Sequence, residues 1–130
     1  MSAESVVKPC TTEAELDALL QQSQDRLVVI DVHPAWSGPC ETLVPTINRM
    51  LLSYENSEER LAFVSCDETL HEKLQTLSSS DAKFTLEGLG CAPLLLVVRF
   101  GKAVGKIDGA NAPALVALVD QQIPPVPEAE

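Results

Sequence analysis

The hydrophobic and polar positions divide the chain into alternating helices and strands. Leucines at helical spacing follow Thr12, a residue type that caps helices, and they predict a helix near residues 12–24. The segment 26–33 is β-branched and apolar, which is typical of a strand buried on both faces. We therefore expect this strand to lie at the centre of a sheet.

A second helix is predicted to open at Pro39, with Leu43, Ile47 and Met50 on one face. Pro45 falls inside this predicted helix, and proline lacks the backbone donor that a helix interior requires. We therefore expect a kink at Pro45.

The rest of the chain predicts further elements in the same alternating style. They are a strand at 61–65, a short helix at 68–77, a polar connection from Ser78 to about residue 90, a strand pair at 94–100 and 102–108, and a helix from Asn111 to about Ile123. Alternation that ends in a hairpin predicts an α/β fold, with a mixed central sheet flanked by helices on both faces.

The length of 130 residues suits one domain with a single core, which we place at 12–123. Residues 1–11 form an N-terminal segment before it, and we expect this segment to be able to add an edge strand. The proline-rich tail 124–130 cannot continue a helix, so we expect it to lie outside the domain.

The charge balance narrows the classes of partner. The chain has 19 acidic and 9 basic residues, giving a net charge of −10. This charge disfavours binding to nucleic acid or to anionic membranes and favours basic protein surfaces. No apolar run approaches the roughly 20 residues of a membrane-spanning helix. We expect a protein partner, with neither nucleic acid nor membrane.

The cysteines are scattered, at positions 10, 40, 66 and 91, so the spacing does not indicate a disulfide framework. Residues 1–5 lack the basic and apolar stretches of a secretory signal. We therefore expect a reducing compartment and a cytoplasmic location.

The segment Trp36-Ser37-Gly38-Pro39-Cys40 follows the predicted central strand directly, where a strand-to-helix turn is expected. A C-x-x-C pair at such a junction is typical of a redox motif. In this chain the first of the two cysteine positions is Ser37, and the second is Cys40.

With these features the chain resembles the thioredoxin family across roughly residues 12–123. The matching residues are Asp31, Trp36, Gly38, Pro39, Cys40, Pro45, Ala92 and Pro93. The resemblance implies that Asp31 is a buried acid beneath the active-site turn, and that Ala92-Pro93 is the cis-proline loop facing it. It also implies that Trp36, Gly38, Pro39, Cys91, Ala92 and Pro93 form the rim on which extended peptides lie.

Ser37 departs from the family pattern at the position of the nucleophilic cysteine. Thiol–disulfide exchange needs a thiolate, and a helix N-terminus lowers a cysteine pKa from about 8.5 toward neutrality. A serine hydroxyl is far less acidic and forms no disulfide with Cys40. The dithiol cycle is therefore chemically impossible for this sequence, and Asp31 becomes a vestigial acid whose pKa we expect burial to raise.

Cys40 keeps a residual thiol, which leaves two interpretations open. It is either an inert, half-buried thiol or a slow monothiol site that pairs with a partner or with Cys91. His33 is not expected to activate Ser37 as a hydrolytic nucleophile. His33, Cys66, Asp67 and His71 lack the tight spacing of metal sites, so we expect no metal ion and no other cofactor.

A narrower resemblance lies in Cys91-Ala92-Pro93 and in the segment 109–115. Both are similar to the ciliary thioredoxin-like group, which includes light chains of outer-arm axonemal dynein and thioredoxin domains fused to nucleoside diphosphate kinase modules. This resemblance implies a location in the axoneme of a cilium or flagellum. It also implies a dynein heavy chain or another axonemal dynein subunit as partner, with the chain monomeric inside the complex.

Two functions follow. The first is an interaction subunit with a degenerate active site. The second is a thiol–disulfide oxidoreductase whose native nucleophile has been replaced at Ser37, or a monothiol redox sensor using Cys40 and Cys91. The codon at position 37 of the natural gene distinguishes a natural serine from an introduced one.

Overall fold

A computed structural model describes residues 7–33, 43–80, 82–84, 86, 94–109 and 111–124. The described strands form one five-stranded sheet in the order β1-β3-β2-β4-β5. β1, β3 and β2 run parallel, whereas β4 and β5 are antiparallel to their neighbours. The strands are β1 (Lys8–Pro9), β2 (Leu27–Val32), β3 (Leu61–Cys66), β4 (Leu94–Arg99) and β5 (Lys102–Asp108).

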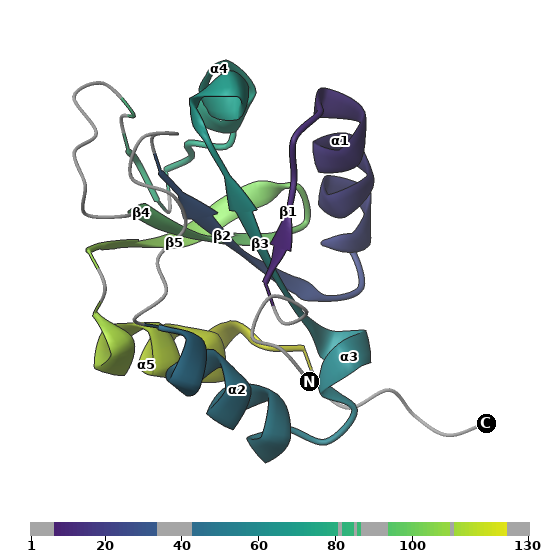
Figure 1. Cartoon of the computed structure of the whole chain (residues 1–130), viewed down its shortest axis with the longest axis vertical. Helices are drawn as coiled ribbons and strands as arrows, with labels where there is room; N and C mark the ends of the chain where they lie inside the picture. The colour runs from purple at the N-terminus through teal and green to yellow at the C-terminus, as the bar shows by residue number, and fades with distance from the viewer. Residues whose placement is uncertain are drawn as a thin grey trace.

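Helices cover both faces of this sheet (Figure 1). α1 (Glu13–Gln22) and α4 (His71–Gln75) lie on one face, and α2 (Val44–Ser53) and α5 (Ala112–Gln122) lie on the other. The short α3 (Ser57–Arg60) leads into β3, and a 3₁₀ turn, Glu68–Leu70, precedes α4. The predicted α/β fold with a mixed sheet is confirmed. No helix in the described ranges is long and apolar enough to cross a membrane.

β2 is the central strand, as its composition predicts. All six of its residues are buried, and it pairs with β3 on one side and β4 on the other. Val28, Ile30 and Val32 pack on the α1 and α4 face, whereas Leu27 and Val29 pack on the α2 and α5 face. Successive side chains thus supply two separate cores, which explains the absence of polar alternation.

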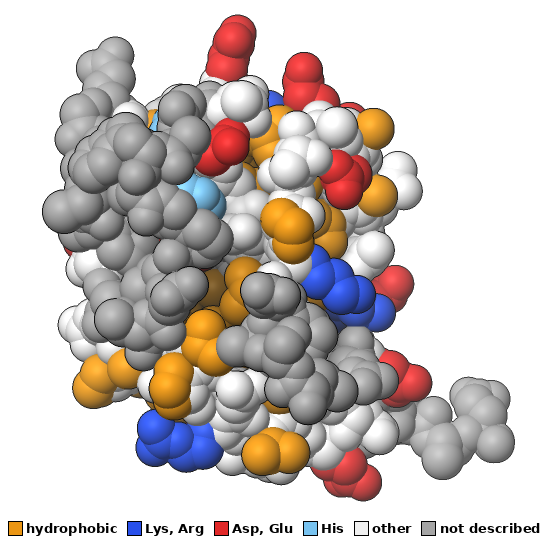
Figure 2. Space-filling view, viewed as in Figure 1, with side chains coloured by type: hydrophobic (Ala, Val, Ile, Leu, Met, Phe, Trp, Pro, Cys, Tyr) orange, Lys and Arg blue, Asp and Glu red, His pale blue; other side chains and the backbone are white. Residues whose placement is uncertain are grey.

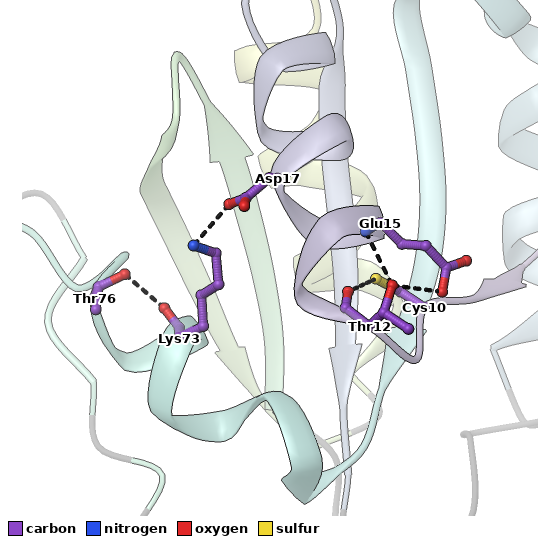
Figure 3. A network of polar contacts seen from close by, with 6 residues as sticks. All are labelled: Cys10, Thr12, Glu15, Asp17, Lys73 and Thr76. Carbon is purple, nitrogen blue, oxygen red and sulfur yellow. Dashed lines mark hydrogen bonds and ion pairs between the residues drawn. The ribbon is translucent and has the colours of Figure 1, made fainter.

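α1 begins with a reciprocal capping arrangement (Figure 3). Thr12 Oγ1 accepts a hydrogen bond from Glu15 N at 3.1 Å, and Glu15 Oε1 accepts one from Thr11 Oγ1 at 3.0 Å. The hydrogen bonds from Thr11 lower the pKa of Glu15. The observed helix lies inside the predicted range and ends at Gln22. On the same face, Lys73 of α4 forms an ion pair with Asp17 at 2.7 Å.

α2 differs from its prediction at Pro45. The described helix begins at Val44, so Pro45 lies in its first turn and not in its interior. No intrahelical partner is needed for a backbone donor at that position, and the structure gives no reason for a kink there. Ile47 and Met50 are buried against the sheet, as expected. The predicted opening of the helix at Pro39 lies outside the described residues.

α5 agrees closely with its prediction. Asn111 is the N-cap, and its side-chain oxygen accepts a hydrogen bond from Ala114 N at 3.2 Å. The chain then continues to Pro124, which was predicted to belong to an unpacked tail. Instead, Pro124 is buried, and its carbonyl oxygen accepts a hydrogen bond from Arg60 Nε at 2.9 Å. Packing therefore extends at least one residue into that segment.

The connection after α4 was predicted to be polar, and its described part is mixed, because Ser80 and Lys83 are exposed but apolar residues between and after them are buried. Ala82, Phe84 and Leu86 are at most 9 % exposed and belong to the core on the α1 and α4 face. Gln75 holds the segment from both directions, because its Nε2 donates to Phe84 O at 2.7 Å and its Oε1 accepts from Leu86 N at 3.0 Å. The serine cluster at its start concealed this alternating apolar pattern.

The turn between β4 and β5 is anchored to the end of α1 by Ser23. This serine is fully buried. Its Oγ accepts a hydrogen bond from Gly101 N at 2.8 Å, and its carbonyl oxygen accepts one from Phe100 N at 2.9 Å. Arg99 Nη1 donates to the same carbonyl oxygen at 2.9 Å. One residue thus fixes the hairpin to the helix that covers it.

We predict that Ser23→Ala lowers the free energy of unfolding by about 1–3 kcal/mol, because it leaves the part-buried Gly101 amide without its acceptor. Urea unfolding followed by circular dichroism measures this loss. Ser53→Ala is the matched control, since the exposed Ser53 hydroxyl bonds only within its own helix. We expect that control to change stability by no more than about 0.5 kcal/mol. Equal effects of the two substitutions would contradict the anchoring role.

Candidate functional site

Of the predicted site residues, the structure describes Asp31. The others lie outside the described residues, so their arrangement stays a prediction. They are Trp36, Ser37, Gly38, Pro39, Cys40, Cys91, Ala92 and Pro93.

Asp31 lies one residue before the carboxyl end of the central strand. It is flanked by Ser65 of β3 and Leu95 of β4, and it is only 8 % exposed. Its neighbour two residues back, Val29, belongs to the core on the α2 and α5 face. The register of the strand thus places a carboxyl group among apolar side chains, where charge is costly.

A small cavity of about 20 Å³ adjoins Asp31. Its volume is sufficient for one water molecule. The described residues that line it are apolar except for Asp31: Val7, Val29, Leu43, Ile47, Phe63, Val64, Leu95 and Leu115. The cavity can therefore hold a hydrogen-bonding partner for the carboxyl group against a largely apolar wall.

His33 follows Asp31 at the end of the strand and is also buried, at 7 % exposure. Its backbone amide donates to Cys66 O at 3.0 Å and so extends the ladder between β2 and β3. Its Nδ1 lies 3.9 Å from Asp31 Oδ1. That separation exceeds a hydrogen bond, so the two groups attract strongly only when the imidazole is protonated.

Asp67, the first residue after β3, lies in the same region. Its Oδ1 accepts hydrogen bonds from Thr69 N at 2.9 Å and from Thr69 Oγ1 at 2.6 Å. These bonds lower the pKa of Asp67, and the nearby His33 and His71 lower it further by a smaller amount. At pH 7 Asp67 is therefore a carboxylate close to two imidazoles.

The structure thus brings together acids and histidines that are far apart in the sequence. The parallel register of β2 and β3 brings these groups together. It pairs Val32 with Cys66, so the residues that follow the two strands lie beside each other. Among the described residues, no group of three or more histidine, cysteine or acidic side chains has the arrangement that would hold a metal ion.

Comparison with known proteins places this arrangement in a family. The thioredoxin family model matches residues 7–121. Thioredoxin-1 of Saccharomyces cerevisiae is 30 % identical over 104 residues, which cover 80 % of this chain and 86 % of the yeast protein. The flagellar outer-arm dynein 16 kDa light chain of Chlamydomonas reinhardtii is 31 % identical over 104 residues, which cover 80 % of this chain and 60 % of that protein.

Thioredoxin domain-containing protein 3 of Rattus norvegicus is 35 % identical over 102 residues. The match covers 74 % of this chain but only 15 % of the rat protein, so the shared part is a small fraction of that relative.

Solved structures agree on the fold. Mitochondrial thioredoxin 3 from Saccharomyces cerevisiae superimposes with a TM-score of 0.62 at 22 % identity, covering 92 % of this chain and 99 % of the yeast chain. Thioredoxin NaTrxh from Nicotiana alata gives the same TM-score at 20 % identity, covering 95 % and 100 %. The family match, the sheet order and the buried acid at the end of the central strand agree, and the chain belongs to the thioredoxin family.

Proposed function

We propose that this protein is a non-enzymatic, thioredoxin-like interaction subunit and a light chain of an outer-arm axonemal dynein. The observation that carries the proposal is Ser37, which stands where the resemblance requires a nucleophilic cysteine. The chain retains the fold and the other residues of the turn, which peptide binding requires. It lacks the nucleophilic cysteine, which thiol–disulfide exchange requires.

Thiol–disulfide exchange is lost because the Ser37 hydroxyl differs from a cysteine thiol in acidity and in the bonds it can form. A thiol near a helix N-terminus ionises close to neutral pH, whereas a serine hydroxyl under the same influence stays protonated. An oxygen at position 37 also cannot form the mixed disulfide on which exchange depends. Asp31, which would serve proton transfer beside a reactive thiol, is left as a buried acid next to its small cavity.

The relatives supply the biological setting of the proposal. Both the 16 kDa and the 14 kDa flagellar outer-arm dynein light chains of Chlamydomonas reinhardtii are similar to this chain, at 31 % and 28 % identity. By this likeness we assign the protein to the cytoplasm and to the axoneme of a cilium or flagellum. Its partner is then a dynein heavy chain or another dynein subunit.

The proposed binding surface is the rim formed by Trp36, Gly38, Pro39 and the loop Cys91-Ala92-Pro93. Peptide recognition on such a rim needs backbone pairing and an apolar pocket, and neither requires a reactive thiol. The net charge of −10 adds a long-range preference for a basic partner. Figure 2 shows acidic side chains spread over one face of the molecule, with lysine and arginine in a few smaller groups.

A second candidate function is thiol–disulfide exchange, and the similarity to yeast Thioredoxin-1 favours it. In this alternative, either the natural chain has cysteine at position 37 or Cys40 acts as a monothiol, alone or with Cys91. The two functions differ in whether binding of the partner survives removal of all thiol chemistry.

We predict that the full chain, with its accessible thiols blocked by N-ethylmaleimide under native conditions that leave the buried Cys10 and Cys66 unmodified, still binds outer-arm dynein extracted from axonemes. Heavy-chain recovery on the immobilised protein, measured by quantitative mass spectrometry, checks this. Trp36→Ala should reduce recovery by about tenfold or more, the scale of a central aromatic contact. Leu52→Ala is the matched control, since Leu52 is an 87 % exposed apolar side chain on α2. Loss of all recovery on thiol blocking would support redox capture instead.

We also predict that the chain as it stands does not accelerate reduction of insulin disulfides by dithiothreitol, and that Ser37→Cys does. Ser37→Ala is the control and should match the unaltered chain. Adding Asp31→Asn to Ser37→Cys should slow the restored reaction by up to about 100-fold, because a proton acceptor is removed. Turbidity of precipitating insulin gives the rates. Activity in the unaltered chain that Cys40→Ser abolishes would establish the monothiol alternative.

A further inference from the structure

Two cysteines outside the family's active-site turn lie next to each other across the β1 and β3 pair. The parallel register aligns Lys8 with Val64 and Pro9 with Ser65. The ladder continues for one more step, because Cys10 N donates to Ser65 O at 2.8 Å. The next residues in register are Cys10, directly after β1, and Cys66, the last residue of β3.

Both side chains point into the same core. Cys10 is 3 % exposed and Cys66 is 1 % exposed, and both belong to the apolar cluster on the α1 and α4 face. Cys10 Sγ also lies 3.8 Å from Thr12 O, at the start of α1 (Figure 3). Two free thiols therefore lie in the same core, one register step beyond the last paired residues of β1 and β3.

The separation of the strands suits a disulfide. Neighbouring strands lie about 4.8 Å apart, and disulfides join residues whose Cα atoms are about 4.4–6.8 Å apart. Residues on adjacent strands that share a register position and a face therefore meet the Cα requirement for a disulfide.

Burial protects the pair while β1 is in place. Desolvation raises the pKa of Cys10, and it raises the pKa of Cys66 more strongly, so both thiols stay protonated at neutral pH. β1 is a two-residue strand at the edge of the sheet. Short edge segments open locally at low free-energy cost, and such opening would expose Cys10 to solvent.

We propose that Cys10 and Cys66 are a site of reversible disulfide formation, which a low-molecular-weight disulfide such as glutathione disulfide oxidises when β1 opens, and which then ties β1 to β3. This site is independent of the proposed dynein function and of the active-site turn, since neither Cys40 nor Cys91 takes part.

The chemistry is two successive exchanges. The Cys10 thiol loses its proton, and its sulfur attacks one sulfur of glutathione disulfide, forming a mixed disulfide and releasing one glutathione thiolate. While β1 is still displaced, the Cys66 thiol loses its proton and its sulfur attacks Cys10 Sγ, releasing the second thiolate, after which β1 returns to the sheet. The two glutathione thiolates take up the two protons. Two protein thiols are oxidised, and one glutathione disulfide is reduced to two glutathiones.

The test uses the full chain treated with glutathione disulfide, then denatured and alkylated with N-ethylmaleimide. Trypsin separates all four cysteines, because cleavage after Arg26, Arg60 and Lys73 leaves Cys10 and Cys66 on peptides that contain neither Cys40 nor Cys91. We expect the intact mass to fall by two hydrogens, the Cys10 and Cys66 peptides to be cross-linked, and dithiothreitol to reverse both changes.

Variants separate this disulfide from one at the active-site turn. Cys10→Ser and Cys66→Ser should each abolish the loss of two hydrogens, whereas Cys40→Ser and Cys91→Ser should leave it intact. Hydrogen exchange of the Cys10 amide should slow in the oxidised chain. Full alkylation of both Cys10 and Cys66 after oxidation of the unaltered chain would overturn the proposal, as would cross-linking of either one to a different cysteine. These two outcomes do not depend on the folding of any variant.

Discussion

Pairing of β2 on both of its edges is the interaction on which the rest of the structure depends. Every residue of this strand is buried. Side chains on its two faces pack in the two cores, between the sheet and the helices that cover it. The same pairing brings acidic and histidine side chains together at the carboxyl ends of β2 and β3. Because β2 and β3 run in parallel, Asp31 is paired with Ser65 of β3, and His33 lies near Asp67, the first residue after β3. A shift of one residue would turn Asp31 to the opposite face.

The local sequence was enough to predict most of this framework. Thr12 and Asn111 are side chains whose capping bonds span only three residues, so their effect is visible without tertiary information. The central strand was equally visible, because burial on both faces removes polar alternation. These features are dictated within a few residues, and sequence patterns record them directly.

What the sequence did not predict depends on partners far along the chain. Pro124 was assigned to a solvated tail, but its carbonyl oxygen accepts a hydrogen bond from the Arg60 guanidinium, 64 residues away. The approach of His33 and His71 to Asp67 likewise depends on strand register and has no characteristic spacing. Of the candidate site, the sequence predicted the burial of Asp31. The chemistry of Ser37 followed from its identity alone, because the reactivity of an oxygen in place of a sulfur does not require a geometry.

The segment from Ser78 to Leu86 gives the fold a property that its polar start conceals. Phe84 and Leu86 cover the sheet beside α4, and Gln75 and Ser78 bind their backbone. The connection therefore carries part of the stability of the domain. Replacing Phe84 or Leu86 with a polar residue would damage the core on the α1 and α4 face and not only a surface loop.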